Sequence, residues 1–280
     1  MFPSASKSPA SEIEAAIEDL AQQPLRSMEA LRRLDELRGM LNSGQASVVE
    51  SSATGWRLHI WVKRGILLHA VLGGLGEVTG SRGGFWDLDT LPARRFRGED
   101  AVRVVPGALV RDGSWIGPGS IILAGSSVAI GASLGNECQV DSGCHIGLCA
   151  HLGNSVFLEA GSRIGGVLNP AERFPAIIGD CSLLAMGAAV MGSVELGQNC
   201  VVGPGVLLSD SSAVWNAVSR EWIRPNLEGR LVLPEGSVLL SGLPPEESST
   251  RARLLMPILA GFAHRDEPAA SAYRRICANA

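Results

Sequence analysis

Residues 140–152 read VDSGCHIGLCAHL, and a branched aliphatic residue returns in them at every sixth position, as Val140, Ile146 and Leu152. The same period runs outward from this stretch in both directions. Before its first interruption the series comprises Val104, Val110, Ile116, Ile122, Val128, Leu134, Val140, Ile146, Leu152, Leu158 and Ile164. It resumes as Ile178, Leu184, Val190, Leu196, Val202, Leu208 and Val214. A period of six fits neither an α-helix nor simple strand alternation, and it predicts a parallel β-helix with three flat sides.

A second pattern supports the same fold, because a small residue stands two positions before nearly every aliphatic one. Its members are Ala108, Ser114, Ser120, Ser126, Ala132, Cys138, Cys144, Ala150 and Ser162, with Val156 as an exception. We expect the aliphatic side chains to point inward and the small residues to turn the corners. The 34 glycines and the aromatic content of 5% agree with this interpretation. Cys138, Cys144 and Cys200 occupy the small position, so we expect them to pack rather than act as nucleophiles.

The repeat is interrupted twice, over residues 165–177 and 215–231. The second interruption carries Arg220, Arg224 and Arg230. These arginines make it a candidate lid or phosphate contact, and a solvated loop fits the segment equally well.

The chain before the repeat has a helical character. Apolar residues recur at helical spacing over 11–21, 27–41 and 61–72, which predicts three helices. Residues 48–61 favour a short hairpin around a glycine, and residues 80–98 favour a loop. This part of the chain, residues 1–100, is therefore expected to form a small helical domain.

The chain after the repeat is expected to form a short cap. Val232 and Val238 return to the six-residue period, and a Pro- and Ser-rich stretch follows at 244–250. The tail then contains Leu254, Leu255, Ile258 and Leu259. A weak helical pattern follows at 273–277. We therefore expect the repeat domain to span residues 101–242, and an edge strand or cap to lie within 243–280.

Composition narrows the class of protein. The net charge is −4 and the isoelectric point is near 5.8, so the chain lacks a field that would attract nucleic acid. No run approaches the roughly 18 apolar residues that a membrane-spanning helix requires. The first ten residues lack the basic and apolar regions of a signal peptide, so we expect a cytoplasmic protein. The six cysteines include no Cys-x-x-Cys pair, which argues against a zinc site.

Several short segments resemble one known family. They are residues 61–63 (WVK), 103–106 (RVVP), 140–141 (VD), 164–168 (IGGVL) and 234–238 (PEGSV). Together with the helical N-terminal part, they resemble the tetrahydrodipicolinate N-succinyltransferases, a branch of the hexapeptide-repeat acyltransferases. The resemblance runs over most of the chain.

The resemblance implies a mainly β fold, a left-handed parallel β-helix assembled as a homotrimer. It further implies an enzyme of the diaminopimelate and lysine branch, an acyltransferase that binds succinyl-CoA, or acetyl-CoA, and a cyclic imine amino acid in grooves between subunits. The amine would attack the thioester directly in a ternary complex. In the family, the residues matching Arg103 and Asp141 contact the substrate. No metal is implied.

The chain departs from the family pattern at the substrate end of the groove. The family's active-site glutamate falls at Ala189, and its Gly-Gly-Val-Leu-Glu-Pro has Asn169 in place of the glutamate. These departures leave two alternatives open. One is a paralogue that acylates a lysine-branch amino acid in specialised metabolism, as in tabtoxin-type β-lactam biosynthesis. The other is a non-catalytic β-helix trimer.

The expected coil brings particular ionisable residues together. Positions 18 apart stack on one face, about 4.8 Å from each other, so Glu159 should lie next to Asp141. We expect Asp141 to hold or deprotonate the attacking amine, with Glu159 as a second member of a carboxylate pair or as an independently solvated residue. His145 should stack with Arg163, and His151 should lie on the next face. Either histidine is an alternative base, or a surface residue.

The remaining candidates concern substrate and donor. Arg103 and Arg111 suit a dicarboxylate substrate, because guanidinium groups bind carboxylates through two hydrogen bonds. The alternative for each is a surface ion pair with Asp112 or Glu99. Coenzyme A needs backbone N–H groups that can be approached closely, and Gly166, Ala185 and Gly203 are the candidates near the expected groove.

Overall fold

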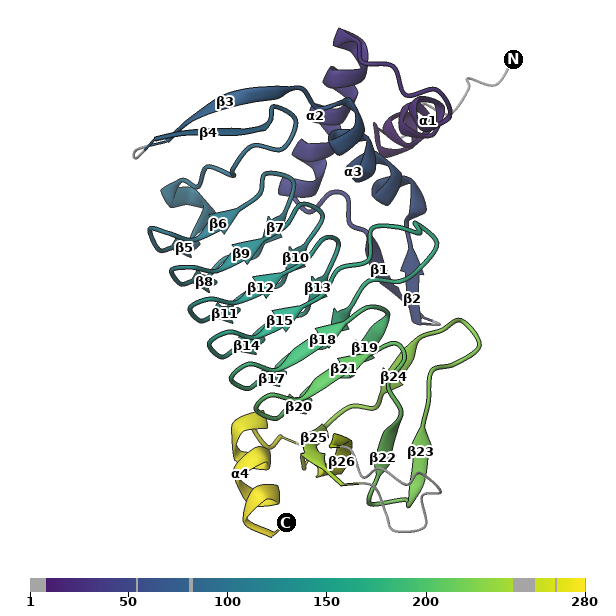
Figure 1. Cartoon of the computed structure of the whole chain (residues 1–280), viewed down its shortest axis with the longest axis vertical. Helices are drawn as coiled ribbons and strands as arrows, with labels where there is room; N and C mark the ends of the chain where they lie inside the picture. The colour runs from purple at the N-terminus through teal and green to yellow at the C-terminus, as the bar shows by residue number, and fades with distance from the viewer. Residues whose placement is uncertain (1–8, 54, 81–82, 244–254, 265, 280) are drawn as a thin grey trace, which may run out of the picture.

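The computed structural model describes residues 9–53, 55–80, 83–243, 255–264 and 266–279 of the chain. Three parallel sheets form the sides of a long coil, with a group of helices at the N-terminal end and a single helix at the C-terminal end (Figure 1). None of the helices in these described ranges is both long and apolar enough to cross a membrane.

The N-terminal helices pack on one another and on the coil. They are α1 (Pro9–Gln22), α2 (Met28–Asn42) and α3 (Ile60–Leu72), and the hairpin β1 (Val49–Ser52) and β2 (Gly55–Leu58) lies between the last two. The side chain of Ser27 accepts a hydrogen bond from the Ala30 amide at 3.1 Å and so begins α2. The leucines of α2 share one apolar cluster with Ile130 and Cys149 of the coil. The three predicted helices and the first hairpin are confirmed.

A second hairpin follows where the sequence predicts a loop. Strands β3 (Leu75–Gly80) and β4 (Gly83–Leu88) pair antiparallel, and the short 3-10 helix η1 (Gly98–Asp100) comes after them. The loop expected over 80–98 is therefore wrong for residues 83–88. Residues 80–98 as a whole are rich in glycine, arginine and aspartate, and the pairing of 83–88 depends on the partner strand 75–80.

Each turn of the coil contributes one strand to each of three sheets. The first sheet contains β5 (Arg103–Val104), β8 (Ile121–Ile122), β11 (Gln139–Val140), β14 (Phe157–Leu158), β17 (Leu183–Leu184), β20 (Val201–Val202) and β25 (Ser237–Gly242). The second contains β6 (Leu109–Val110), β9 (Ser127–Val128), β12 (His145–Ile146), β15 (Arg163–Ile164), β18 (Ala189–Met191) and β21 (Leu207–Ser209). The third contains β7 (Trp115–Ile116), β10 (Ser133–Leu134), β13 (His151–Leu152), β16 (Ile177–Ile178), β19 (Val194–Leu196) and β24 (Leu231–Leu233). The predicted parallel β-helix is confirmed.

The interior follows the six-residue pattern. Val140 lies between Ile122 and Leu158 of the neighbouring coils, and all three side chains are buried. The small residues are buried as well, and burial raises the pKa of the Cys138 thiol to about 11 and that of Cys200 to about 12. Both thiols therefore stay protonated near neutral pH, as expected for packing residues.

Glycines are abundant because the corners need left-handed backbone. Between the first and second sheets, one residue before each small residue has a positive φ, and that residue is a glycine in every coil. These glycines are Gly107, Gly125, Gly143, Gly161, Gly187 and Gly205. Only glycine adopts such a conformation without steric cost.

The first interruption forms a loop fastened from both sides. Lys63 of α3 is fully buried and donates a hydrogen bond to the carbonyl oxygen of Arg173 at 2.6 Å. On the other side the Arg230 guanidinium lies 4.0 Å from the ring centroid of Phe174 and pairs with Glu195. Arg230 is thus a structural residue rather than a free phosphate contact.

The C-terminal part combines two hairpin strands, an added strand and a helix. Strands β22 (Val214–Asn216) and β23 (Glu221–Ile223) occupy the second interruption, β26 (Met256–Phe262) pairs antiparallel with β25, and α4 is Ala269–Asn279. The tail forms a strand and a terminal helix at the end of the coil, but β26 lies between β22 and β25 and is not the edge strand that the sequence suggested, and Leu254 lies outside the described residues. Helix α4 covers the outward face of the last coils, where Ala272 and Ile276 cluster with Val201.

Candidate active site

Four ionisable side chains gather at one corner of the coil, on two successive turns. Asp141 follows β11 and His145 begins β12 on one turn, and Glu159 and Arg163 occupy the same two places on the next turn. The strand register, Val140 opposite Leu158 and His145 opposite Arg163, places the members of each pair side by side. We call these four residues the corner group. The predicted stacking of Asp141 with Glu159 and of His145 with Arg163 is confirmed.

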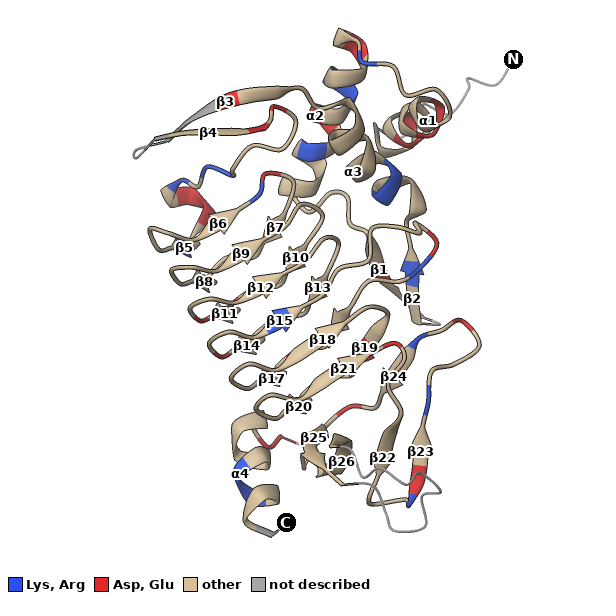
Figure 2. Cartoon of the chain, viewed as in Figure 1, with Lys and Arg blue, Asp and Glu red and all other residues tan. Residues whose placement is uncertain are grey.

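The corner group is sharply bounded. In the same two columns, the turn before it presents Leu123 and Ser127, the turn after it presents Ala185 and Ala189, and the next presents Gly203 and Leu207. No other ionisable side chain of the described coils stands in these columns. Figure 2 shows a basic segment on β15 within an otherwise largely uncharged second sheet. Charge is therefore confined to two turns of the coil.

Backbone amides hold the two carboxylates. Asp141 Oδ1 accepts a hydrogen bond from the amide of Ser142 at 2.6 Å, and Glu159 Oε2 accepts one from the amide of Met186 at 2.8 Å. Among the described residues, no hydrogen bond joins the two carboxylates to each other. Each acid is thus oriented separately, and a carboxylate pair depends on proximity rather than on a shared proton in this structure.

His145 and Arg163 differ in their hydrogen bonding. His145 is exposed, and its Nδ1 lies 2.8 Å from the hydroxyl oxygen of Ser127 on the preceding turn. That contact leaves Nε2 directed away from the bond. Arg163 is also exposed, and it forms no ion pair with any residue that the structure describes.

The arginines proposed for the substrate lie in different places. Arg103 is exposed on the outward face of the first sheet, opposite Ile121 and two turns before Asp141. Arg111 lies at the corner between the second and third sheets, where its Nη1 pairs with Asp87 Oδ2 of β4 at 2.6 Å. The structure therefore does not bring Arg111 together with the corner group, and it pairs with an acid that the sequence interpretation did not consider.

His151 is not available as a base. Its ring lies beside Trp56 of β2, with ring centroids 4.9 Å apart. Its Nδ1 is buried and has no hydrogen-bond partner among the described residues. Burial lowers the pKa of His151 to about 4. The expectation of an exposed His151 is wrong because the N-terminal hairpin covers this face of the third sheet.

The three candidates for coenzyme A binding separate into two groups. Ala185 and Gly203 continue the column of Asp141 and Glu159 on the next two turns. Gly166 lies at the following corner, where a Cβ atom would overlap the carbonyl oxygen of Leu148. Ala185 and Gly203 are buried next to the corner group, and a Cβ atom at Gly203 would lie 2.9 Å from the carbonyl oxygen of Leu239, so Gly166 and Gly203 both have packing reasons of their own.

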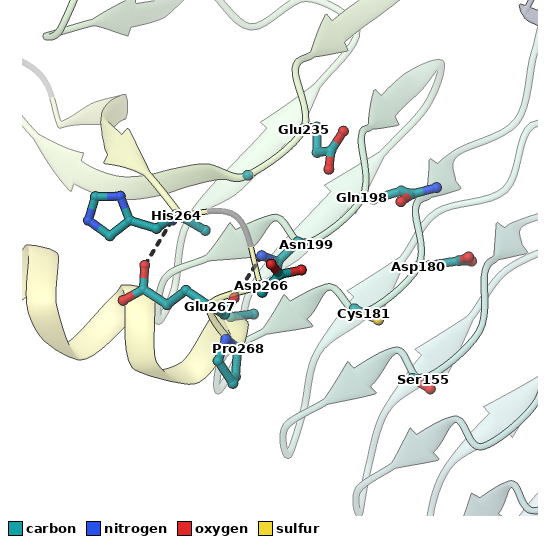
Figure 3. Close-up of a pocket in the computed structure, with 13 residues that line it drawn as sticks. Ser155, Asp180, Cys181, Gln198, Asn199, Glu235, His264, Asp266, Glu267 and Pro268 are labelled. Carbon is teal, nitrogen blue, oxygen red and sulfur yellow. Dashed lines mark hydrogen bonds between the residues drawn. The ribbon is translucent and has the colours of Figure 1, made fainter.

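A cavity that the sequence did not indicate lies on the far edge of the first sheet (Figure 3). Its volume is about 880 Å³, and coil corners and the segment before α4 line it together. Asp180, Glu235, Asp266 and Glu267 contribute carboxylates to the lining. The salt bridge with Arg275 lowers the pKa of Glu267 to about 2. An excess of carboxylates disfavours a phosphorylated donor here. Only the tertiary fold unites residues so far apart in the chain.

The corner group has the parts that amide formation requires. A carboxylate can hold an ammonium or accept its proton, and cationic nitrogen donors can hold an anionic group of the same molecule. Ala185 and Ala189 on the next turn carry only methyl groups, while Ala185 and Gly203 are themselves buried. Within the described residues, no three His, Cys, Asp or Glu side chains gather closely enough to hold a metal ion.

The six-residue repeat and the three parallel sheets place the chain in the hexapeptide-repeat class of parallel β-helix proteins. A family model described as tetrahydrodipicolinate N-succinyltransferase N-terminal matches residues 9–72. The chain is 37% identical over 247 residues to the 2,3,4,5-tetrahydropyridine-2,6-dicarboxylate N-succinyltransferase of Shewanella sediminis, covering 85% of this chain and 86% of that protein. It is 39% identical over 240 residues to the enzyme of the same name from Leptothrix cholodnii, covering 82% and 84%. The chain therefore belongs to the tetrahydrodipicolinate N-succinyltransferase family, and the prediction of an acyltransferase is confirmed.

Proposed function

We propose that this chain transfers an acyl group from an acyl-CoA donor to the amine of a tetrahydrodipicolinate-like amino acid. Succinyl-CoA is the first candidate donor, because the relatives are named N-succinyltransferases. The placement of Asp141 within the corner group carries this proposal, since it offers a carboxylate at an open corner beside small residues. The proposed assembly is a homotrimer of left-handed β-helices, with acceptor and donor in the grooves between subunits.

In the proposed reaction water first opens the cyclic imine, which leaves a ketone and a free primary amine, and this amine attacks the thioester carbon. A C–N bond forms, the C–S bond breaks, and coenzyme A leaves as the thiol after a proton has passed from the amine to the sulfur. Asp141 holds the ammonium or accepts its proton, and Arg103 binds a carboxylate of the acceptor.

One observation favours a second candidate function. Ala189 provides no carboxylate where the family pattern has a glutamate, and its side chain is a single methyl group on the turn after Arg163. A changed acceptor would account for a changed site. The second candidate is therefore acylation of a related amino acid in specialised metabolism, and a β-helix trimer without catalysis is the third.

A thiol-release assay separates these candidates. Succinyl-CoA and acetyl-CoA are each offered with tetrahydrodipicolinate and with 2-aminopimelate, and the wild type is compared with Asp141→Asn. We expect succinyl transfer that falls about 100-fold or more in Asp141→Asn, the size of effect typical for a lost acid–base group. Asp19→Asn, which changes an exposed acid on α1, serves as the matched control.

Three results would count against the leading function. Turnover with neither acceptor, while acyl-CoA still binds, favours a different amine and the specialised pathway. Absence of any acyl-CoA binding favours the non-catalytic trimer. Full activity in Asp141→Asn rejects the role given to this carboxylate.

A further inference from the structure

Arg163 lies in the middle of the second sheet and forms no ion pair with any residue that the structure describes. It is the outward residue of β15, it lies opposite His145 on one side and Ala189 on the other, and it is exposed. Two other arginines near the coil are occupied, since Arg111 pairs with Asp87 and Arg230 with Glu195, whereas Arg103 is exposed as Arg163 is. Among the described residues, Arg163 has no carboxylate to neutralise it.

The residue beside Arg163 leaves space for a ligand. Ala189 carries only a methyl group, and the next outward residue in the column is Leu207. Neighbouring strands lie about 4.8 Å apart, so about 10 Å of sheet surface separates the Arg163 and Leu207 positions. An acidic side chain at position 189 would stand in register with Arg163 and pair with it. Alanine at 189 therefore keeps the guanidinium free and the adjacent surface open.

The corner group places acidic and basic side chains on opposite sides of this space. Asp141 and Glu159 lie on the first-sheet side of the corner and attract an ammonium group. Arg163 and His145 lie on the second-sheet side and attract an anion, with the His145 ring held by Ser127 at 2.8 Å. An acceptor that carries an amine at one end and a carboxylate at the other matches this separation of charge.

We propose that Arg163 is the specificity-determining residue that binds the side-chain carboxylate of the acceptor, in the space that Ala189 leaves open. This inference rests on the proposed function, because the ligand is the acceptor of the acyl transfer. It gives the alanine at 189 a positive role, since an acid there would compete with the acceptor for Arg163. Planar guanidinium groups bind carboxylates through two parallel hydrogen bonds, which explains why arginine suits this position.

The first test is equilibrium binding to the full-length protein by calorimetry, with two probes. 2-Aminopimelate carries a side-chain carboxylate, and 2-aminoheptanoate is the same chain without it. We expect the wild type to prefer 2-aminopimelate, and Arg163→Gln to weaken that probe about tenfold to a hundredfold while leaving 2-aminoheptanoate within about threefold. Arg57→Gln, on the exposed face of β2, is the matched control. Equal losses for both probes, no loss, or no binding of either probe by the wild type would overturn the proposal.

The second test introduces the competing acid. Ala189→Glu should weaken 2-aminopimelate at least about tenfold, and the isosteric Ala189→Gln should weaken it less than about threefold. Tighter binding or faster acyl transfer in Ala189→Glu would contradict the inference. Acyl-CoA turnover is followed separately. Selective binding of 2-aminopimelate without turnover rejects the proposed function and keeps the Arg163 site, whereas turnover with unselective binding does the reverse.

Discussion

Asp141 and Glu159 lie on neighbouring turns of the coil. Asp141 accepts a hydrogen bond from the amide of Ser142, and Glu159 accepts one from the amide of Met186. Two negative charges on neighbouring turns attract an ammonium group more strongly than one charge does. Glu159→Gln keeps an oxygen for the Met186 amide and removes the charge. We therefore expect turnover to fall about tenfold. Glu137→Gln, at another corner, is the control. An unchanged rate would end the pair hypothesis.

Gly166 has two possible roles, which are packing and donor binding, and a single substitution distinguishes them. A methyl group there would overlap the Leu148 carbonyl oxygen. We expect Gly166→Ala to lower the free energy of unfolding by about 3 kcal/mol. Gly161→Ala is the control, since its Cβ would meet open space and only its positive φ of 72° resists the change, at about 1 kcal/mol. Normal stability with weaker coenzyme A binding would instead support the donor role.

At the scale of elements, the hairpin β1–β2 sets the environment of His151 on the third sheet. It places Trp56 over His151, and burial lowers the pKa of that histidine from 6.5 to about 4. As the pH falls below 6.5 the unfolded chain binds the proton and the folded chain does not, so the folded state loses stability. The loss continues until the pH approaches 4, and it is absent above 6.5.

This linkage gives a measurable pH dependence. Between pH 6.5 and about 5, His151 should cost the folded state about 2 kcal/mol, and His151→Phe should remove that part of the loss while keeping the aromatic contact. Urea denaturation of both proteins at the two pH values measures the difference. His145→Gln, which changes an exposed histidine, should leave the loss unchanged. A His151→Phe variant with the same loss as wild type would show that His151 is solvated.

At the scale of the whole molecule, one protomer leaves apolar side chains on the outward second sheet. Leu109, Met191 and Leu207 are exposed by 42%, 39% and 57%. A threefold assembly would cover such a face, and three chains of 29.3 kDa would have a mass of roughly 88 kDa. Leu207→Glu should shift the mass measured by sedimentation toward that of one protomer, because a charge would be buried unpaired. Leu227→Glu, on a fully exposed loop, should not. A wild type that sediments as a monomer would contradict the proposed trimer.

The six-residue period by itself determined most of this protein. It predicted the inward aliphatic residues, the buried cysteines and the stacking of Asp141 on Glu159, because each turn of a β-helix repeats the same local geometry and pairs with residues only 18 positions away. The three N-terminal helices were equally readable, since capping and apolar spacing are local signals.

Tertiary structure alone decided the features in which distant segments meet. The Arg111–Asp87 pair, the burial of His151 under Trp56 and the acidic cavity before α4 all join the coil to elements outside the repeat. No period in the sequence relates such segments, so their docking depends on the shapes and charges of whole surfaces. The exposure of Arg163 was also decided by the tertiary structure, because it depends on where the described elements outside the repeat pack on the coil.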